Sequence, residues 1–300
     1  MAYQRLKGTG VALVTPFQEN GSVDFSALEK LVTHVIKGGV DFLVALGTTA
    51  ETSTLSLAEK QEVLGAIVKY CDGQIPVVCG VGGNNTDEVL QMLKDLDLRN
   101  IDAILSVTPY YNRPSQEGLY QHFKAIAAGT NKPIILYNVP GRTGSNILPE
   151  TVLRLAADCS NIVAIKEASG NIPQCMELLR TKPDNFTVLS GDDNLILAQM
   201  AIGMEGIISV AANCFTKEIT DIVNLAIVGK FDKARKVLYR ILPGIDMLFV
   251  EGNPAGVKAV MKHMGVCENV LRLPLTPVSE ATGNRIHTFL TDSYSVPHHH

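Results

Sequence analysis

Short runs of apolar residues recur along the chain up to about residue 210. They are rich in Val, Ile and Leu, and their starts lie 20 to 34 residues apart. The runs are continuous rather than alternating, which is typical of strands in a parallel sheet covered on both faces. The pattern therefore predicts eight strands, at residues 11–14, 41–46, 75–80, 102–107, 132–138, 161–166, 186–190 and 206–210.

Helical patterns lie between the predicted strands. Ser56 and Glu59 form a capping box before an apolar stripe within residues 63–68. Pro149 suits the first turn of a later helix. Eight strand–helix units in alternation favour an α/β fold of the (β/α)8 TIM barrel type over an open sheet.

The last part of the chain has a different pattern. No strand run follows residue 214, and apolar spacing predicts helices over 216–229, 231–242 and 253–264. We expect a barrel over residues 1–214 and a C-terminal helical extension over 215–297 packed on it. Residues 298–300 are three histidines and are interpreted as the remnant of an affinity tag.

Composition and charge exclude several classes of protein. A content of 46% hydrophobic and 19% charged residues indicates a folded core rather than a disordered chain. No apolar stretch reaches the roughly 20 residues of a membrane span, and the N-terminus has no hydrophobic leader, so we expect a cytoplasmic protein with no membrane partner. A net charge of −4 without a basic block argues against nucleic acid as a partner.

The sequence gives no sign of a metal site. The six cysteines include no CxxC pair, and the body histidines have neither HxH nor HExxH spacing. Asp192 and Asp193 lack a third acidic ligand, so we interpret them as the N-cap of a helix over 194–203. The cysteines are expected to be reduced thiols in the core.

Polar segments follow each predicted strand, where a barrel of this type places its active site. Lys166 ends the strand 161–166, so its ammonium should point into the barrel mouth, where desolvation favours the neutral, nucleophilic amine. The alternative is an ion pair such as Lys166–Glu167. Tyr137 ends the preceding strand and should lie beside Lys166, either as a proton shuttle or as a packed tyrosine.

Three other loops carry candidate groups. Arg142 has the fork that grips a carboxylate, although a lone loop arginine is also typical of a solvated surface. Thr48 and Thr49 offer hydroxyls and backbone N–H groups for a carboxylate or a proton relay, or form an ordinary turn. Tyr110 and Tyr111 fit loop packing or a subunit interface.

The order of these motifs resembles the dihydrodipicolinate synthase family, part of the class I pyruvate-dependent aldolase and lyase superfamily. The resemblance covers residues 5–290 and includes the tail segments NPAGVK and LRLPLTP. Its main motifs are GTTAE (47–51), TPYYNRPSQEGLYQHF (108–123), YNVPGRTG (137–144), IKEASG (165–170) and SGDD (190–193).

The resemblance implies a reaction and a set of roles. Pyruvate would condense with L-aspartate 4-semialdehyde, on the way to diaminopimelate and lysine, with neither metal nor organic cofactor. Such enzymes are usually homotetramers, dimers of dimers. The implied roles are Schiff-base lysine for Lys166; proton relay for Tyr137, Thr48 and Tyr111, the last reaching into a neighbouring subunit; pyruvate-carboxylate contact for Thr49; aldehyde-carboxylate binding for Arg142; and a backbone carbonyl near the lysine for Ile208.

Two classes of alternative stay open. An N-acetylneuraminate lyase, a keto-deoxy sugar aldolase or a hydroxyproline-pathway lyase would share the lysine, the tyrosine and the barrel. Arg142 and the Tyr110–Tyr111 pair suit a short carboxylated aldehyde better than a polyol. A non-catalytic binding barrel would tolerate loss of Lys166 or Tyr137, and a metal-dependent aldolase would need a histidine cluster.

The sequence departs from the family pattern at two places. Ala50 stands where glycine is usual, which matters if that residue needs a positive φ. Asn84, Glu88 and Tyr110 match the site where lysine inhibits many relatives. Leu57 and Lys60, however, stand where lysine-sensitive relatives often carry histidines.

We therefore predict weak or absent inhibition by lysine, because a fixed cation at Lys60 repels the ammonium groups of the effector. The measurement is the initial rate at saturating substrates over a lysine titration. An inhibition constant comparable with that of lysine-sensitive relatives would contradict the prediction.

Overall fold

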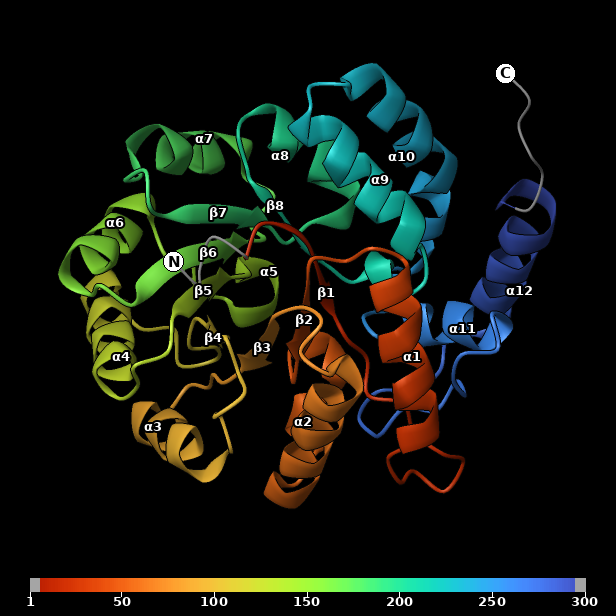
Figure 1. The fold of residues 1–300 in the computed structure, drawn as a ribbon, viewed down its shortest axis with the longest axis horizontal. Helices are drawn as coiled ribbons and strands as arrows, with labels where there is room; N and C mark the ends of the chain where they lie inside the picture. The colour runs from red at the N-terminus through yellow and green to blue at the C-terminus, as the bar shows by residue number, and fades with distance from the viewer. Residues whose placement is uncertain (1–5, 295–300) are drawn as a thin grey trace.

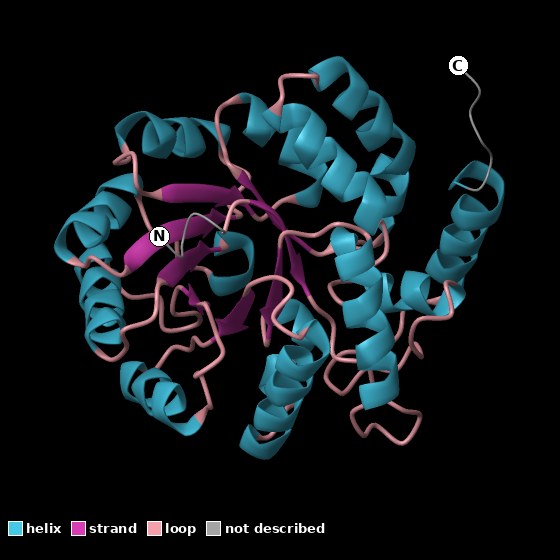
Figure 2. Cartoon of the chain, viewed as in Figure 1, coloured by secondary structure: helices cyan, strands magenta, loops and turns pink. Residues whose placement is uncertain are grey.

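The computed structural model describes residues 6–294, so the tag interpretation of 298–300 lies outside the described residues. Its strands form one closed parallel barrel in sequence order, enclosed by helices (Figures 1 and 2). The predicted TIM barrel is confirmed. The strands are β1 (Gly8–Ala12), β2 (Phe42–Ala45), β3 (Val77–Gly80), β4 (Ala103–Val107), β5 (Ile134–Asn138), β6 (Ile162–Glu167), β7 (Thr187–Ser190) and β8 (Gly206–Ser209).

The first strand begins earlier than its apolar run predicts. The run 11–14 is buried, but the hydrogen-bonded ladder of β1 starts at Gly8, which pairs with Gly206 of β8. Leu13 and Val14 continue beyond the strand into the core between the barrel and the helices. Hydrophobicity marks burial, and it does not mark which buried residues share a ladder.

The helices match the predicted segments with two differences. The capping box of Ser56 and Glu59 is present at the start of α2. The prediction ended α10 at residue 242, but the helix continues through Pro243 because its next turn packs into the core. Helix α12 was not predicted. The helices are α1 (Phe25–Lys37), α2 (Leu57–Cys71), α3 (Thr86–Asp95), α4 (Gln116–Ala128), α5 (Pro140–Thr143), α6 (Pro149–Asp158), α7 (Ile172–Thr181), α8 (Ile196–Ala201), α9 (Thr216–Ile227), α10 (Phe231–Met247), α11 (Ala255–His263) and α12 (Glu280–Thr288).

The C-terminal helices α10 to α12 lie on one flank of the barrel, beyond α1 and α9 (Figure 1). Helix α9 packs on β1 and β8, and α10 packs on α9. A division of the chain at residue 214 stays a prediction. Within residues 6–294 we find no helix that is both long and apolar enough to cross a bilayer.

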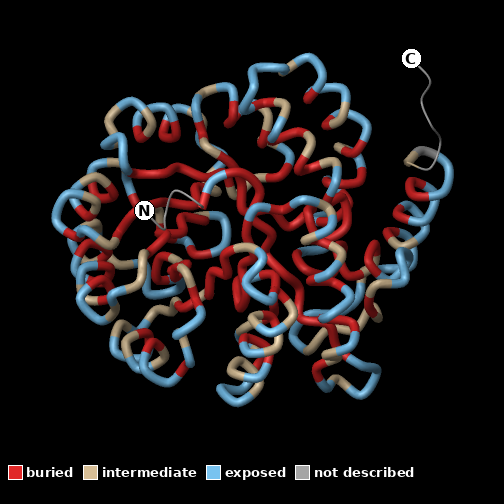
Figure 3. The backbone as a smooth tube through the Cα atoms, viewed as in Figure 1, coloured by how far each residue is buried: buried red, intermediate tan, exposed pale blue. Residues whose placement is uncertain are grey.

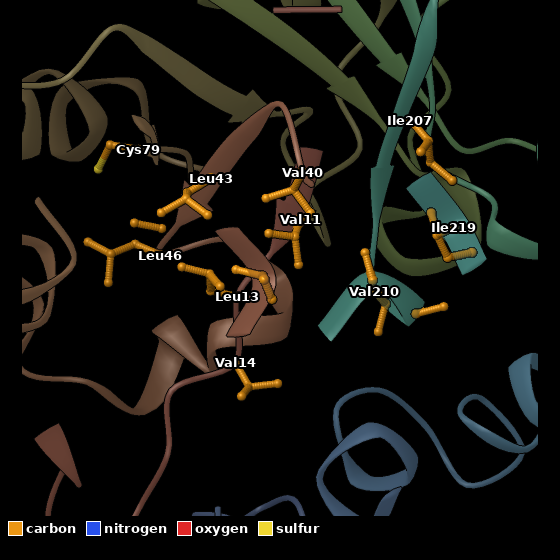
Figure 4. Packing of buried hydrophobic residues seen from close by; sticks show 14 of the residues in the cluster. Val11, Leu13, Val14, Val40, Leu43, Leu46, Cys79, Ile207, Val210 and Ile219 are labelled. Carbon is orange, nitrogen blue, oxygen red and sulfur yellow. The ribbon is translucent and has the colours of Figure 1, made fainter. Parts of the chain in front are cut away.

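The strands bury both faces, which explains their unbroken apolar runs (Figure 3). One face packs against the helices, as Val11, Leu43 and Ile207 do (Figure 4). The other face fills the barrel interior. Its residues include Ala12, Phe42, Val44, Val78, Ala103, Leu105, Ile135, Tyr137, Ala164, Leu189 and Ile208.

Closure of the barrel depends on glycine at the β8–β1 seam. Gly206 has φ +148°, and a Cβ there would lie 2.0 Å from the carbonyl oxygen of Gly8. Backbone atoms cannot move aside as a side chain can, so we predict that Gly206→Ala lowers the free energy of unfolding by about 3 kcal/mol. The matched control is Gly65→Ala on α2, where no atom lies within 4 Å of the added methyl. It should raise stability by about 0.5–1 kcal/mol in the same urea titration, and equal effects of the two variants would refute the argument.

A buried histidine joins α3 to α4. His122 Nδ1 lies 2.8 Å from the Thr86 hydroxyl, and burial lowers the His122 pKa to about 4. Between pH 6.5 and 4 the unfolded chain therefore binds more protons than the native one. The free energy of unfolding decreases as the pH is lowered through this range. We predict a loss of about 3 kcal/mol from this residue between pH 7 and pH 4.

The measurement compares urea unfolding of wild type, His122→Gln and the exposed-residue control His263→Gln at both pH values. The His122 variant should lose less stability on acidification than the other two proteins. Parallel pH profiles for all three would show that His122 does not carry the effect.

Candidate active site

Lys166 lies near the end of β6, and the alternation of the strand turns it into the barrel. It pairs in register with Tyr137 of β5. Lys166 is only 5% exposed, and its Nζ lies 4.3 Å from the centre of the Tyr137 ring. No ion pair found within residues 6–294 includes it. The expectation that these two side chains are neighbours is confirmed.

The alternative interpretation of Lys166 as half of an ion pair with Glu167 is wrong. Consecutive residues of a strand face opposite sides, and Glu167 points outward. Its carboxylate accepts hydrogen bonds from Asn138 Nδ2 at 3.1 Å, the Ser169 N–H at 2.7 Å and Gln174 Nε2 at 3.3 Å. Burial raises the pKa of Glu167.

The predicted N-cap role of Asp192 and Asp193 is also wrong. Neither side chain caps the turn that follows. The buried carboxylate of Asp193 instead accepts bonds from the N–H groups of Val210, at 3.0 Å, and Ala211, at 3.1 Å, and from the Ser209 hydroxyl. Asp193 thus holds the end of β8, and these donors are too far along the chain for local capping rules to reveal them.

A cavity of about 440 Å³ opens at the carboxyl ends of β2 to β5. Of the residues predicted to act in catalysis or substrate binding, Thr48, Tyr137 and Arg142 line it. Arg142 is exposed, and its side chain forms no ion pair within the described chain. Thr143 also lines the cavity. The sequence analysis missed it, although it directly follows Arg142 in YNVPGRTG.

Several residues of the sequence analysis do not line the cavity, and Lys166 is one of them. Thr49 is 2% exposed, and its hydroxyl accepts a hydrogen bond from Asn253 Nδ2 at 2.9 Å. Ile208 is fully buried in the inner core. Ala50 does not have a positive φ, whereas Glu51 does, at +53°. The methyl of Ala50 therefore brings no backbone strain.

The two adjacent tyrosines have different surroundings. Tyr110 lines the cavity and is 44% exposed, whereas Tyr111 does not line it and is 89% exposed. Tyr111 has φ +71°, which is uncommon for a bulky residue, and its N–H donates to the Thr143 carbonyl at 3.2 Å. The Tyr111 side chain is thus presented to solvent on a fixed backbone.

The residues matching an effector site lie in the same cavity as Thr48. Asn84 and Glu88 line it together with Tyr110, and Asn84 Nδ2 donates to the Tyr110 carbonyl at 3.1 Å. Lys60 lines it as well, while Leu57 is exposed and does not. One continuous cavity therefore joins the two groups of residues.

Sequence reasoning missed a buried ion pair behind this cavity. Glu51 Oε1 lies 2.6 Å from Lys258 Nζ, and neither side chain is exposed. The motifs GTTAE and NPAGVK contain the two residues, which are 207 positions apart. Their separation explains why no local pattern could pair them.

Comparison with known proteins agrees with the geometry. A sequence model of the Dihydrodipicolinate synthetase family matches residues 5–293. The chain is 51% identical to the 4-hydroxy-tetrahydrodipicolinate synthase of Flavobacterium psychrophilum over 286 residues, or 95% of this chain and 98% of that one. It is 51% identical to that of Parabacteroides distasonis over 290 residues, covering 97% and 98%.

Solved structures show the same likeness in three dimensions. Dihydrodipicolinate synthase from Thermotoga maritima superposes with a TM-score of 0.93 at 41% identity, covering 96% of this chain and 98% of that one. A monomeric variant of dihydrodipicolinate synthase superposes with a TM-score of 0.94 at 40% identity, covering 97% and 98%. The matches include the C-terminal helices, so the barrel and the extension recur together.

Proposed function

Because this chain belongs to the dihydrodipicolinate synthetase family, we propose that Lys166 is the residue on which its reaction proceeds. The chain is a lyase that condenses pyruvate with L-aspartate 4-semialdehyde to give 4-hydroxy-tetrahydrodipicolinate, a step of diaminopimelate and lysine biosynthesis. The observation that carries the proposal is a buried lysine that belongs to no ion pair of the described residues and stands in register with Tyr137 at the barrel mouth.

The chemistry needs a nucleophilic amine in an enclosed site. The neutral amine of Lys166 attacks the ketone carbon of pyruvate, and loss of water gives an iminium ion. Removal of a methyl proton gives an enamine, whose carbon attacks the aldehyde. The amino group of the semialdehyde then displaces the lysine as the ring closes, which regenerates the free amine.

Proton transfer is assigned to Tyr137, Thr48 and Tyr111. Tyr137 is the phenol beside the reacting nitrogen, and Thr48 lines the same cavity. Tyr111 would complete the relay in a neighbouring subunit, which its 89% exposure supports. We propose a homotetramer, a dimer of dimers, for this reason. The fold itself does not require one, since a monomeric variant shares it.

Two carboxylates need partners. The exposed guanidinium of Arg142 at the cavity wall suits the carboxylate of the incoming aldehyde, since its fork binds a carboxylate through two hydrogen bonds. The turn that carries Thr49 is proposed to bind the carboxylate of pyruvate. The backbone carbonyl of Ile208 is proposed to lie close to Lys166. Asn84, Glu88 and Tyr110 form the proposed effector site, and the cytoplasm is the proposed location.

The sugar-lyase alternatives differ in the aldehyde they accept. We predict pyruvate consumption with aspartate semialdehyde and none with N-acetylmannosamine or glyceraldehyde. Borohydride should trap a pyruvate adduct on Lys166, located by peptide mass. Lys166→Ala should lose the adduct and lower kcat on the order of 10⁴-fold or more.

Lys94→Ala, which removes an exposed lysine on α3, is the matched control and should behave as wild type. An adduct at another lysine, or none, would remove Lys166 from the mechanism. Turnover with a sugar aldehyde would contradict the proposal that Arg142 binds the carboxylate of the incoming aldehyde.

A further inference from the structure

The turn that carries Thr48 and Thr49 is held in an unusual conformation. Residues in left-handed conformation bracket it, Leu46 at φ +55° and Glu51 at φ +53°. Residues of these types seldom adopt that conformation, which persists where the surrounding contacts fix it. Whatever holds Glu51 therefore also sets the position of the threonine pair.

The C-terminal extension holds Glu51 by its side chain. One carboxylate oxygen lies 2.6 Å from Lys258 Nζ, and the other accepts the N–H of Arg272 at 3.0 Å. Lys258 Nζ also donates to the Val270 carbonyl at 2.8 Å and lies 4.1 Å from the centre of the Phe17 ring. Both charges are thus fully buried, and both have several partners.

The guanidinium of Arg272 extends the same connection. It donates to the carbonyls of Gly21 and Thr54, each at 2.8 Å, and to the carboxylate of Glu59. This ion pair holds the pKa of Glu59 at about 2. Arg272 thereby ties the loop after β1, the end of the threonine turn and the start of α2 to the extension.

A third contact reaches the threonine pair directly. Asn253, 7% exposed, donates from Nδ2 to the Thr49 hydroxyl at 2.9 Å. It stands at the start of the segment NPAGVK, whose last residue is Lys258. One short segment of the extension thus holds both Thr49 and Glu51.

A buried ion pair is a poor source of stability, because desolvation of the two charges offsets much of their attraction. Such a pair does, however, fix the relative positions of its two side chains. All three contacts from the extension reach the same turn. We infer that Asn253, Lys258 and Arg272 are positioning residues of the active site, which hold the turn of Thr49 where the carboxylate of pyruvate binds. The inference rests on the proposed role of that turn in binding pyruvate.

The test separates the two half-reactions. In a ping-pong reaction kcat/KM for each substrate reports its own half-reaction, so Asn253→Ala should lower kcat/KM for pyruvate about 10-fold or more. The value for aspartate semialdehyde and the melting temperature should stay close to wild type. Because Asn253 acts through the Thr49 hydroxyl, adding Asn253→Ala to Thr49→Val should cause no further loss.

The buried pair is tested without leaving a lone charge. The double variant Glu51→Gln/Lys258→Met should show the same selective loss for pyruvate. Its control is Lys262→Met, on the same helix as Lys258, which breaks the exposed Lys262–Glu268 pair and should change neither value. If the double variant does not fold, the double-mutant cycle of Asn253→Ala and Thr49→Val alone tests the positioning role.

Two failures are distinguishable. Equal losses for both substrates, no loss, or additive losses in the Asn253 and Thr49 cycle would overturn the positioning role. Failure of the wild-type protein to form a borohydride-trapped adduct on Lys166 would instead overturn the proposed function, whatever the variants do.

Discussion

Every side chain of a closed parallel barrel faces either the interior or the surrounding helices, and the choice alternates along each strand. This constraint decides whether a polar residue at a strand end points into the barrel or toward the helices. Lys166 faces inward beside Tyr137, and the next residue, Glu167, faces outward to Asn138 and Gln174. A register shift of one residue would exchange the lysine for the carboxylate. The seam between β8 and β1, where Gly8 meets Gly206, closes the barrel and so fixes that register.

The chain buries two lysines in different surroundings. Lys258 has a carboxylate at 2.6 Å, and Lys166 has an aromatic ring and no ion pair within the described residues. Lys258 is anchored by the Glu51 carboxylate and the Val270 carbonyl, and burial lowers its pKa. Lys166 is buried beside Tyr137 and outside the ion pairs of the described residues, which leaves its amine available to act as a nucleophile. The same residue type therefore serves structure in one place and chemistry in the other.

The extension and the barrel meet at the turn after β2. Asn253 contacts Thr49, and Lys258 and Arg272 contact Glu51. Two strands away around the barrel, Asp193 holds the end of β8 through backbone N–H groups. Both supports are buried and directional, and neither lines the cavity. The reacting groups thus stand on backbone that is fixed from behind, as preorganised sites require.

The sequence by itself determined the barrel, its eight strands, the strand ends that carry Lys166 and Tyr137, and the segments after strands that carry Thr48 and Arg142. These follow from periodicity and from the order of strand and helix, which are local properties. Only the tertiary structure decided that Asp193 binds the end of β8 rather than a helix start, that β1 begins at Gly8, and that Glu51 pairs with Lys258. Their partners lie 16 to 207 residues away, and the free energy of a buried contact depends on what surrounds it rather than on its neighbours in the chain.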